Sequence, residues 1–289
     1  MHDTRIVRAA EKDSLFPQAE AFLLPHEKSC CILMQSVLQK SGCVFVILKK
    51  AGHSREEIAG VFSLSDGKAL SICIPFFSDE INAALISFLK DTAVFCITGA
   101  SREVKKMQEL VFQSQNILAE DERNMVLMEY DPEMQKKENH PPVKIQQCEP
   151  ADADGLFPLH LAYVSEEVLP PWKQPFPASE RVQLEHSLKA RRVFAAVHDG
   201  TICAKAHISA ETHSFVQIGG VFTKPEFRSN GYASQLVHEI ARTFWQQHLR
   251  TVLFVNEKNK SALRAYTNAA FRPFGTYRIA YFKPSARIS

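Results

Sequence analysis

QIGGVFTKPEFRSNGYASQLVHEIARTFWQQH, from Gln217 to His248, joins an apolar run, a turn with a glycine and a periodic segment. The run around Val221 predicts a strand. The apolar residues that follow recur at three- and four-residue spacing, which predicts an amphipathic helix; they are Ala233, Leu236, Val237, Ile240, Ala241 and Phe244. A strand that leads through such a loop into a helix offers backbone N–H groups and the positive end of the helix dipole to an anion. The sequence therefore predicts an anion site between the strand and the helix.

The loop between this strand and this helix matches neither of two common phosphate-binding motifs. Neither G-x-x-x-x-G-K-[ST] nor G-x-G-x-x-G after a strand occurs in the chain. Arg228 to Ala233 instead reads R-x-x-G-x-A, which resembles the pyrophosphate loop of the GNAT acetyltransferases, [RQ]-x-x-G-x-[GA]. Taken by itself, the loop fits an ordinary helix start with a glycine equally well.

A second motif follows where the same family carries one. Thr251 to Asn256 is rich in β-branched and aromatic residues, which predicts a strand. From Asn259 to Phe271 the chain reads NKSALRAYTNAAF, similar to the family pattern N-x-x-A-x-x-x-Y-x-x-x-G-F, with Ala270 in place of the glycine. The matching residues are Asn259, Ala262, Tyr266 and Phe271. Two motifs in the right order make the resemblance specific over Val193 to Phe282.

The composition is that of an ordinary globular chain. Its 289 residues are 45% hydrophobic and 23% charged, which suits one large or two ordinary domains with a sizeable core. A net charge of +2 indicates neither nucleic-acid nor membrane binding. No apolar run is long enough to span a bilayer, and the charged N-terminal segment lacks the apolar core of a signal peptide. We therefore expect a cytoplasmic protein without a nucleic-acid or membrane partner.

The cysteines and histidines indicate neither a disulfide framework nor a metal site. The chain has seven cysteines, an odd number, and no C-x-x-C pair, so they are expected to be buried thiols in a reducing compartment. His207 and His213 show no ligand spacing with other metal-binding residues, and we expect no metal.

The expected elements follow a similar order in both halves of the chain. The first half contains a helix at 27–40, strands at 44–48, 58–64 and 69–77, a helix at 79–90, a strand at 93–97, a helix at 101–113 and a strand at 125–130. From its second strand onward, the second half repeats this order, which is that of the GNAT fold. We therefore predict an α/β (α+β) protein of two tandem GNAT-like domains, each with a mixed, mostly antiparallel central sheet flanked by helices.

A polar, proline-bearing segment separates the two halves. Asp131 to Lys144 reads DPEMQKKENHPPVK and predicts a linker. We expect a first domain at 1–131, a linker at 132–142 and a catalytic domain at 143–289. In the first half, the strand at 69–77 runs straight into Ser78-Asp79-Glu80, where two acids would face a pyrophosphate. The first domain is therefore expected to be a degenerate GNAT-like domain without a CoA loop.

The resemblance implies transfer of an acetyl group from acetyl-CoA to a primary amine by direct attack in a ternary complex. It assigns the pyrophosphate to the loop residues Arg228, Ser229, Asn230, Gly231, Tyr232, Ala233 and Ser234. It assigns the pantetheine arm to Val221, Phe222 and Thr223, with a main-chain N–H near Val221 facing the thioester carbonyl. Asn256 and Asn259 stand where family members approach CoA, and Asn259 also suits a helix N-cap.

Proton transfer needs an acid and a base. Tyr266 matches the family's general acid, although a tyrosine on an amphipathic helix usually packs in a core. A base is needed because lysine-like amines have a reference pKa of about 10.4. Glu167 and, next, Glu166 are the preferred bases, since they precede the Pro170-Pro171 break where the family opens its acceptor pocket; a solvated helix end explains them nearly as well. The remaining candidates are His160, His207 and His213, which as single histidines are more often structural.

Two classes of function remain open. The first is an acetyl-CoA-dependent N-acetyltransferase, and the second is a non-catalytic acyl-CoA-binding regulatory module. The intact Tyr266 favours the enzyme. A tandem-fold ligase that transfers aminoacyl groups would not need so complete a CoA loop. The sequence leaves open the amine acceptor, the acyl chain length and the choice between monomer and homodimer.

Overall fold

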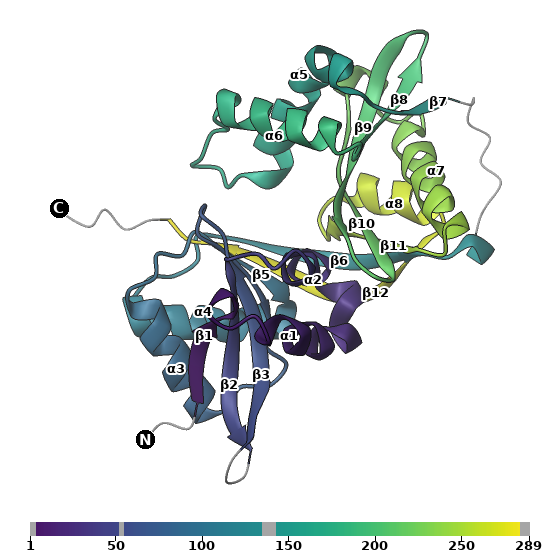
Figure 1. Cartoon of the computed structure of the whole chain (residues 1–289). Coiled ribbons are helices and arrows are strands. Elements are labelled where there is room, and N and C mark those ends of the chain that lie inside the picture. The colour runs from purple at the N-terminus through teal and green to yellow at the C-terminus, as the bar shows by residue number, and fades with distance from the viewer. Residues whose placement is uncertain (1–3, 52–54, 135–142, 284–289) are drawn as a thin grey trace. The chain divides into compact units, whose positions relative to one another are not determined.

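The computed structural model describes residues 4–51, 55–134 and 143–283. By their contacts these residues form two compact units. The first unit falls within Met1–Val126 and Gly275–Ser289, and the second is Leu127–Phe274. Each unit contains a mixed, mostly antiparallel sheet with helices packed against it (Figure 1). The predicted fold class is confirmed.

The sheet of the first unit begins at the N-terminal strand. Its strands lie in the order β1 (Thr4–Arg8), β2 (Val44–Ala51), β3 (Arg55–Leu64), β4 (Ala69–Cys73) and β5 (Cys96–Ala100), followed by the end of β12 (Phe271–Tyr281) and the start of β6 (Asp121–Tyr130). β4 and β5 pair in parallel. The pairs β1–β2, β2–β3, β3–β4 and β5–β12 are antiparallel.

Helices cover both faces of this sheet because its strands alternate two sets of apolar side chains. Val46 and Val61 pack with α1 (Leu15–Leu23) and α2 (Cys31–Leu38). Ile47 and Phe62 pack with α3 (Asp79–Lys90) and α4 (Ser101–Gln115). Ser78 caps the N-terminus of α3, since its Oγ accepts a hydrogen bond from the N–H of Ile81.

The second unit is built in the same way and contains the residues of both sequence motifs. From the end of β6, its strands lie in the order β11 (Arg250–Asn256), β10 (Phe215–Thr223), β9 (Thr201–Glu211), β8 (Val193–His198) and β7 (Lys144–Gln147). Its helices are α5 (Ala153–Tyr163), α6 (Pro177–Lys189), α7 (Tyr232–Gln246) and α8 (Lys260–Asn268). α5 and α7 pack on opposite faces of β9 and β10 (Figure 1).

Several expected elements differ from the observed ones. β1 and α1 were not predicted, and the helix expected at 27–40 is confined to Cys31–Leu38, because a 3₁₀ segment occupies Leu24–Ser29. The strand expected at 69–77 ends at Cys73. At the end of the chain, β12 runs without a break from Phe271 to Tyr281.

The compact units also divide the chain differently from the expected domains at 1–131 and 143–289. β12 leaves the second unit at Phe274, and its end from Tyr277 to Tyr281 pairs with β5 of the first unit. β6 likewise begins in the first unit and enters the second at Leu127. The C-terminal end of β12 is therefore hydrogen-bonded to β5 in the first unit. Residues 135–142 of the expected linker lie outside the described residues.

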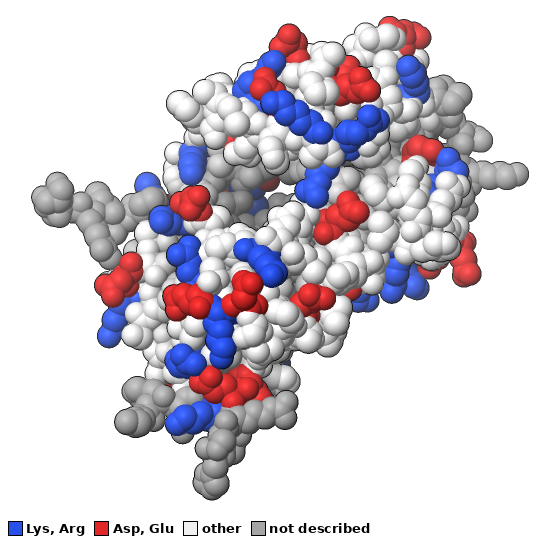
Figure 2. All heavy atoms as spheres, in the orientation of Figure 1, with Lys and Arg blue, Asp and Glu red and all other residues white. Residues whose placement is uncertain are grey.

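The surface is mixed in charge. On the face that Figure 2 shows, acidic and basic side chains are interspersed and form no continuous patch of one sign. This distribution agrees with the net charge of +2. Within the described part of the chain, no helix combines the length and apolar character needed to cross a membrane.

Candidate active site

The site begins where β10 and β11 separate. Residues Phe215–Gln217 of β10 pair with Arg250–Val252 of β11, whereas the pairing of β10 with β9 continues to Thr223. A β-bulge between Gly219 and Phe222 bends β10 there. The end of β10, from Val221 to Thr223, consequently lines a cavity instead of the middle of a sheet.

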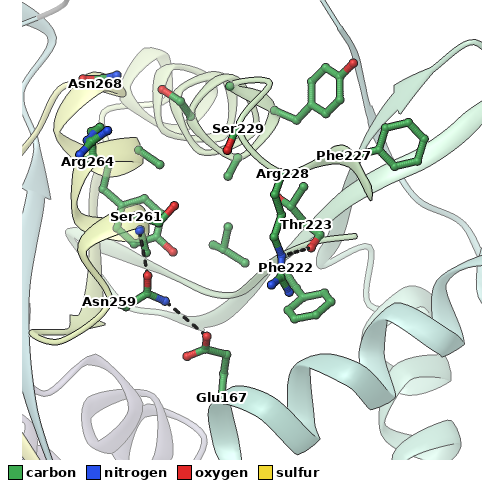
Figure 3. Close-up of a pocket in the computed structure, with 18 of the residues that line it drawn as sticks. Glu167, Phe222, Thr223, Phe227, Arg228, Ser229, Asn259, Ser261, Arg264 and Asn268 are labelled. Atoms are coloured by element: carbon green, nitrogen blue, oxygen red, sulfur yellow. Dashed lines mark hydrogen bonds between the residues drawn. The ribbon is translucent and has the colours of Figure 1, made fainter. Parts of the chain in front are cut away.

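That cavity has a volume of about 420 Å³ and lies within the second unit (Figure 3). Its walls come from the end of β10, the loop that follows, the start of α7, one face of α8 and the helical turn after α5. The volume is in the range of roughly 300–1,000 Å³ that is usual for ligand pockets. Of the residues assigned to CoA, the proposed acid Tyr266 and the preferred bases Glu166 and Glu167, all line the cavity except Asn230 and Asn256.

The loop presents the N-terminus of α7 to the cavity. Gly231 is the N-cap, with φ of 76°, a left-handed conformation that suits glycine. Asn230 lies behind the loop, where its Nδ2 donates to the carbonyls of Phe227 at 3.1 Å and Arg228 at 3.3 Å. The start of α7 lines the cavity, and first-turn N–H groups have no acceptor within their own helix. The helix dipole and these donors therefore suit an anion at this wall.

Arg228 adds a cation to the same wall. Its Nε donates to the carbonyl of Thr223 at 3.2 Å, and its guanidinium lies 5.3 Å from the ring centroid of Phe222. Its Nη2 lies 3.1 Å from the Oε2 of Glu166. Both side chains of this ion pair are about half exposed, at 49% each. Arg228 is thus held at the cavity and remains open to solvent.

Asn259 connects the start of α8 to Glu167 on the turn after α5 (Figure 3). Its Oδ1 accepts from the N–H of Ala262 at 3.0 Å, which makes it the predicted N-cap of α8. Its Nδ2 donates to the Oε1 of Glu167 at 3.3 Å. Asn256 instead braces the turn before α8, where its Oδ1 accepts from the N–H of Lys258 at 3.0 Å.

Glu166 and Glu167 belong to a π-helical turn, Val164–Val168, which follows α5. The N–H of Leu169 donates to the carbonyl of Val164 at 2.9 Å, which closes the wide turn. π-turns are rare and often occur at functional sites. The turn brings both carboxylates to the cavity wall.

Tyr266 reaches the cavity from α8 and is 7% exposed. Burial raises the pKa of its hydroxyl, and the neighbouring Tyr163 and Glu167 raise it further. The hydroxyl is therefore protonated at neutral pH and can act as a donor.

The three candidate histidines lie elsewhere. Burial lowers the pKa of His160 to about 4 and that of His207 to about 3, and the nearby Lys205 adds to both shifts. Neither histidine lines the cavity, and both are neutral at neutral pH. His213 is exposed between β9 and β10. Among the described residues, no group of three His, Cys, Asp or Glu side chains is placed to hold a metal ion.

The structure adds lining residues that sequence reasoning did not identify. Ser261, Arg264 and Asn268 form a polar stripe along α8 at three- and four-residue spacing. That spacing could have identified them, but a solvent-facing stripe has the same pattern.

Sequence reasoning also missed Lys205, which is buried on β9 and donates to the carbonyl of Gly220. A lysine within an apolar strand does not by itself indicate which group it contacts in the fold.

Residues 161–271 match the family described as the acetyltransferase (GNAT) family. An uncharacterised N-acetyltransferase of Mycobacterium tuberculosis strain H37Rv is 32% identical over 88 residues. The match covers 30% of this chain, and the chain spans 56% of the length of the curated relatives that it matches.

Solved structures share the fold of nearly the whole chain. An acetyltransferase of the GNAT family from Colwellia psychrerythraea has a TM-score of 0.61 at 11% identity, over 97% of this chain and 99% of that one. A tandem GNAT protein from the clavulanic acid biosynthesis pathway has a TM-score of 0.59 at 13% identity, over 98% and 99%. At these identities the likeness concerns the fold alone.

Proposed function

We propose that the chain is an N-acetyltransferase that transfers an acetyl group from acetyl-CoA to a primary amine, because residues 161–271 match the acetyltransferase (GNAT) family. One observation carries the proposal: a single cavity joins the loop from Arg228, the open end of β10 and Tyr266. The amine attacks the thioester directly while both substrates are bound.

The loop is proposed to hold the pyrophosphate of CoA. Backbone N–H groups of Gly231, Tyr232 and Ala233 would donate to its oxygens, and Arg228 would add a charge-assisted hydrogen bond. Arg228 must first exchange its partner Glu166 for the pyrophosphate. Arg264, at the same cavity, supplies a further cation for the phosphates.

The end of β10 is proposed to bind the pantetheine arm and the thioester. Backbone groups from Val221 to Thr223 line the cavity, where they can pair with the amides of that arm. The N–H of Val221 would stabilise the negative charge that develops on the thioester oxygen during attack.

Tyr266 is proposed to donate a proton to the sulfur when the carbon–sulfur bond breaks. Its raised pKa keeps the hydroxyl protonated until that moment. A thiol has a reference pKa near 8.5, and the burial that raises the pKa of Tyr266 also disfavours a thiolate beside it. The products are CoA as a free thiol and the acetylated amine.

Glu167 is proposed to take the proton of the attacking amine, directly or through one water. It lines the cavity, and its charge acts on Tyr266. Glu166, whose carboxylate pairs with Arg228 before CoA binds, is the second candidate. The buried His160 and His207 and the exposed His213 do not reach the cavity.

The first unit is proposed to bind no CoA. β4 and β5 are the parallel pair there, as β10 and β11 are in the second unit. Just beyond β4, the N–H of Ile74 donates to the Oε2 of Glu103 at 2.7 Å. This carboxylate from α4 occupies the backbone donor that a pantetheine amide or a thioester would need.

The test is the release of free CoA thiol from acetyl-CoA in the presence of a panel of primary amines. Amine-dependent release by the wild-type chain, together with its loss in Tyr266→Phe, supports the enzyme. Binding of acetyl-CoA without release for any amine would favour the alternative, a non-catalytic acyl-CoA-binding regulatory module.

A further inference from the structure

Lys205 lies in the interior of the second unit, directly behind the proposed thioester site. It is on β9, is 1% exposed, and its Nζ donates to the carbonyl of Gly220 at 3.1 Å. The Nζ also lies 4.6 Å from the ring centroid of Tyr163 on α5. Lysine is rarely buried to this extent, because removing its charge from water is costly. A buried lysine that bonds a backbone carbonyl therefore needs an explanation beyond stability.

The backbone that Lys205 contacts is the bulge of β10. Gly220 has φ of 60°, and a Cβ added there would lie 2.1 Å from the Nδ1 of His207. A side chain at Gly220 would therefore meet both left-handed strain and a ring that packs on the strand. The bulge and its neighbours on β9 fit each other closely.

Gly220 and Val221 share one peptide unit, which connects Lys205 to the reaction. A trans peptide is planar, so its C=O and N–H point in opposite directions and turn together. The bond from Lys205 to the Gly220 carbonyl thus fixes the direction of the Val221 N–H. A cation at the oxygen also polarises the amide and strengthens its N–H as a donor.

We propose that Lys205 is a positioning residue, which orients and polarises the Gly220–Val221 peptide so that the Val221 N–H stabilises the charge on the thioester oxygen. The inference rests on the proposed function. Lys205 does not line the cavity, so it acts on the thioester oxygen through the peptide.

The surroundings of Lys205 give the proposal a pH signature. Facing it are His207 on β9, His160 and Tyr163 on α5, and Glu180 on α6, whose Oε2 lies 3.1 Å from His160. Both histidines are neutral at neutral pH. Burial lowers the pKa of Lys205 to about 7, so its charge is present below this pH and lost above it. The polarising effect should fade as the pH rises from 6 to 8.

The test compares wild type with Lys205→Met, a neutral side chain of similar length, and with Lys189→Met, an exposed control on α6. We expect Lys205→Met to be as stable as wild type or more stable, because it removes a buried charge. Its kcat should fall about ten- to a hundredfold, as expected for a misplaced catalytic group. The ratio of wild-type to variant kcat should decrease between pH 6 and 8.

A binding measurement separates this proposal from the proposed function. Wild type should bind acetyl-CoA more tightly than CoA, through the Val221 N–H, and Lys205→Met should lose that preference while its affinity for CoA changes less than threefold. If wild type binds acetyl-CoA but acetylates no amine, the proposed function fails and the preference still decides the role of Lys205. The proposed role of Lys205 is overturned if Lys205→Met keeps the preference for acetyl-CoA over CoA. It is also overturned if the kcat of Lys205→Met equals that of wild type and the ratio of the two does not change between pH 6 and 8. If Lys205→Met does not fold, Lys205→Gln replaces it, under the same criteria.

Discussion

The Nη2 of Arg228 lies 3.1 Å from the Oε2 of Glu166, so the cation proposed to meet the pyrophosphate already has a carboxylate partner across the cavity. Beside it, Glu167 accepts a hydrogen bond from Asn259, the N-cap of α8. The π-turn after α5 thus contacts both walls of the proposed CoA site. Binding of CoA has to break at least the contact with Arg228, which would free this turn for the acceptor amine.

Glu166→Gln is expected to strengthen acetyl-CoA binding about two- to fivefold, because exposed ion pairs contribute about 0.2–1 kcal/mol and the variant removes a competitor of the pyrophosphate. Calorimetry at low salt would measure the effect, which should shrink at high salt. Glu239→Gln is the matched control, since Glu239 pairs with Arg242 on α7 and does not line the cavity. Equal or weaker binding by Glu166→Gln would contradict the competition.

Glu167→Gln is expected to lower kcat by roughly a hundredfold or more, with an affinity for CoA close to that of wild type, because a general base acts on the amine and not on the cofactor. Steady-state kinetics at neutral pH, beside a CoA titration, would measure both quantities. Full activity in this variant would place the base elsewhere, and Glu166 would be the next residue to test.

Tyr266→Phe keeps the ring in its buried site and removes the proton donor. We expect kcat to fall roughly ten- to ten-thousand-fold, with folding and CoA affinity retained. Tyr277→Phe is the matched control, because Tyr277 is similarly buried, at 8% exposed, in the first unit. Unchanged turnover in Tyr266→Phe, with the chemical step shown to limit the rate, would reduce Tyr266 to a packing residue.

One CoA should bind per chain, at the loop of the second unit. Gly231→Asp would strain a left-handed position and place a negative charge against the pyrophosphate, so binding should be lost. Gly200→Asp controls for the strain: Gly200 also has φ of 76°, in the β8–β9 turn, and a Cβ there meets no atom within 4 Å. Calorimetry that found two CoA molecules per chain, or normal binding by Gly231→Asp, would refute this assignment.

Acid should destabilise the second unit through its buried histidines. The pKa of His207 falls from an unfolded value near 6.5 to about 3 on folding, so the unfolded chain binds the extra proton between these values. Above pH 6.5 the neutral His207 side chain therefore contributes its full stability. As the pH falls from 6.5 toward 3, the free energy of unfolding decreases by about 1.4 kcal/mol per pH unit.

Tryptophan fluorescence isolates this effect, because both tryptophans, Trp172 and Trp245, belong to the second unit. Urea unfolding between pH 6.5 and 4 should show a shallower loss of stability in His207→Asn than in wild type. The exposed His213→Asn should behave like wild type. Parallel pH curves for all three proteins would mean that His207 does not control the acid response.

The sequence by itself determined the elements whose signals are local. The glycine N-cap of α7, the Asn259 cap of α8 and the periodic apolar face of α7 all depend on residues within about one or two helical turns. The same signals identified the loop that lines the cavity, and the order of elements indicated two related folds.

Only the tertiary structure decided the contacts between residues distant in sequence. The meeting of Arg228 with Glu166, the hydrogen bond from Ile74 to Glu103 and the burial of Lys205 behind Gly220 depend on how strands and helices pack. β12 shows the same limit, because its apolar pattern fits a strand but does not say which neighbour it pairs with. Such partners are set by register and packing across the whole sheet, which a local pattern of side chains does not encode.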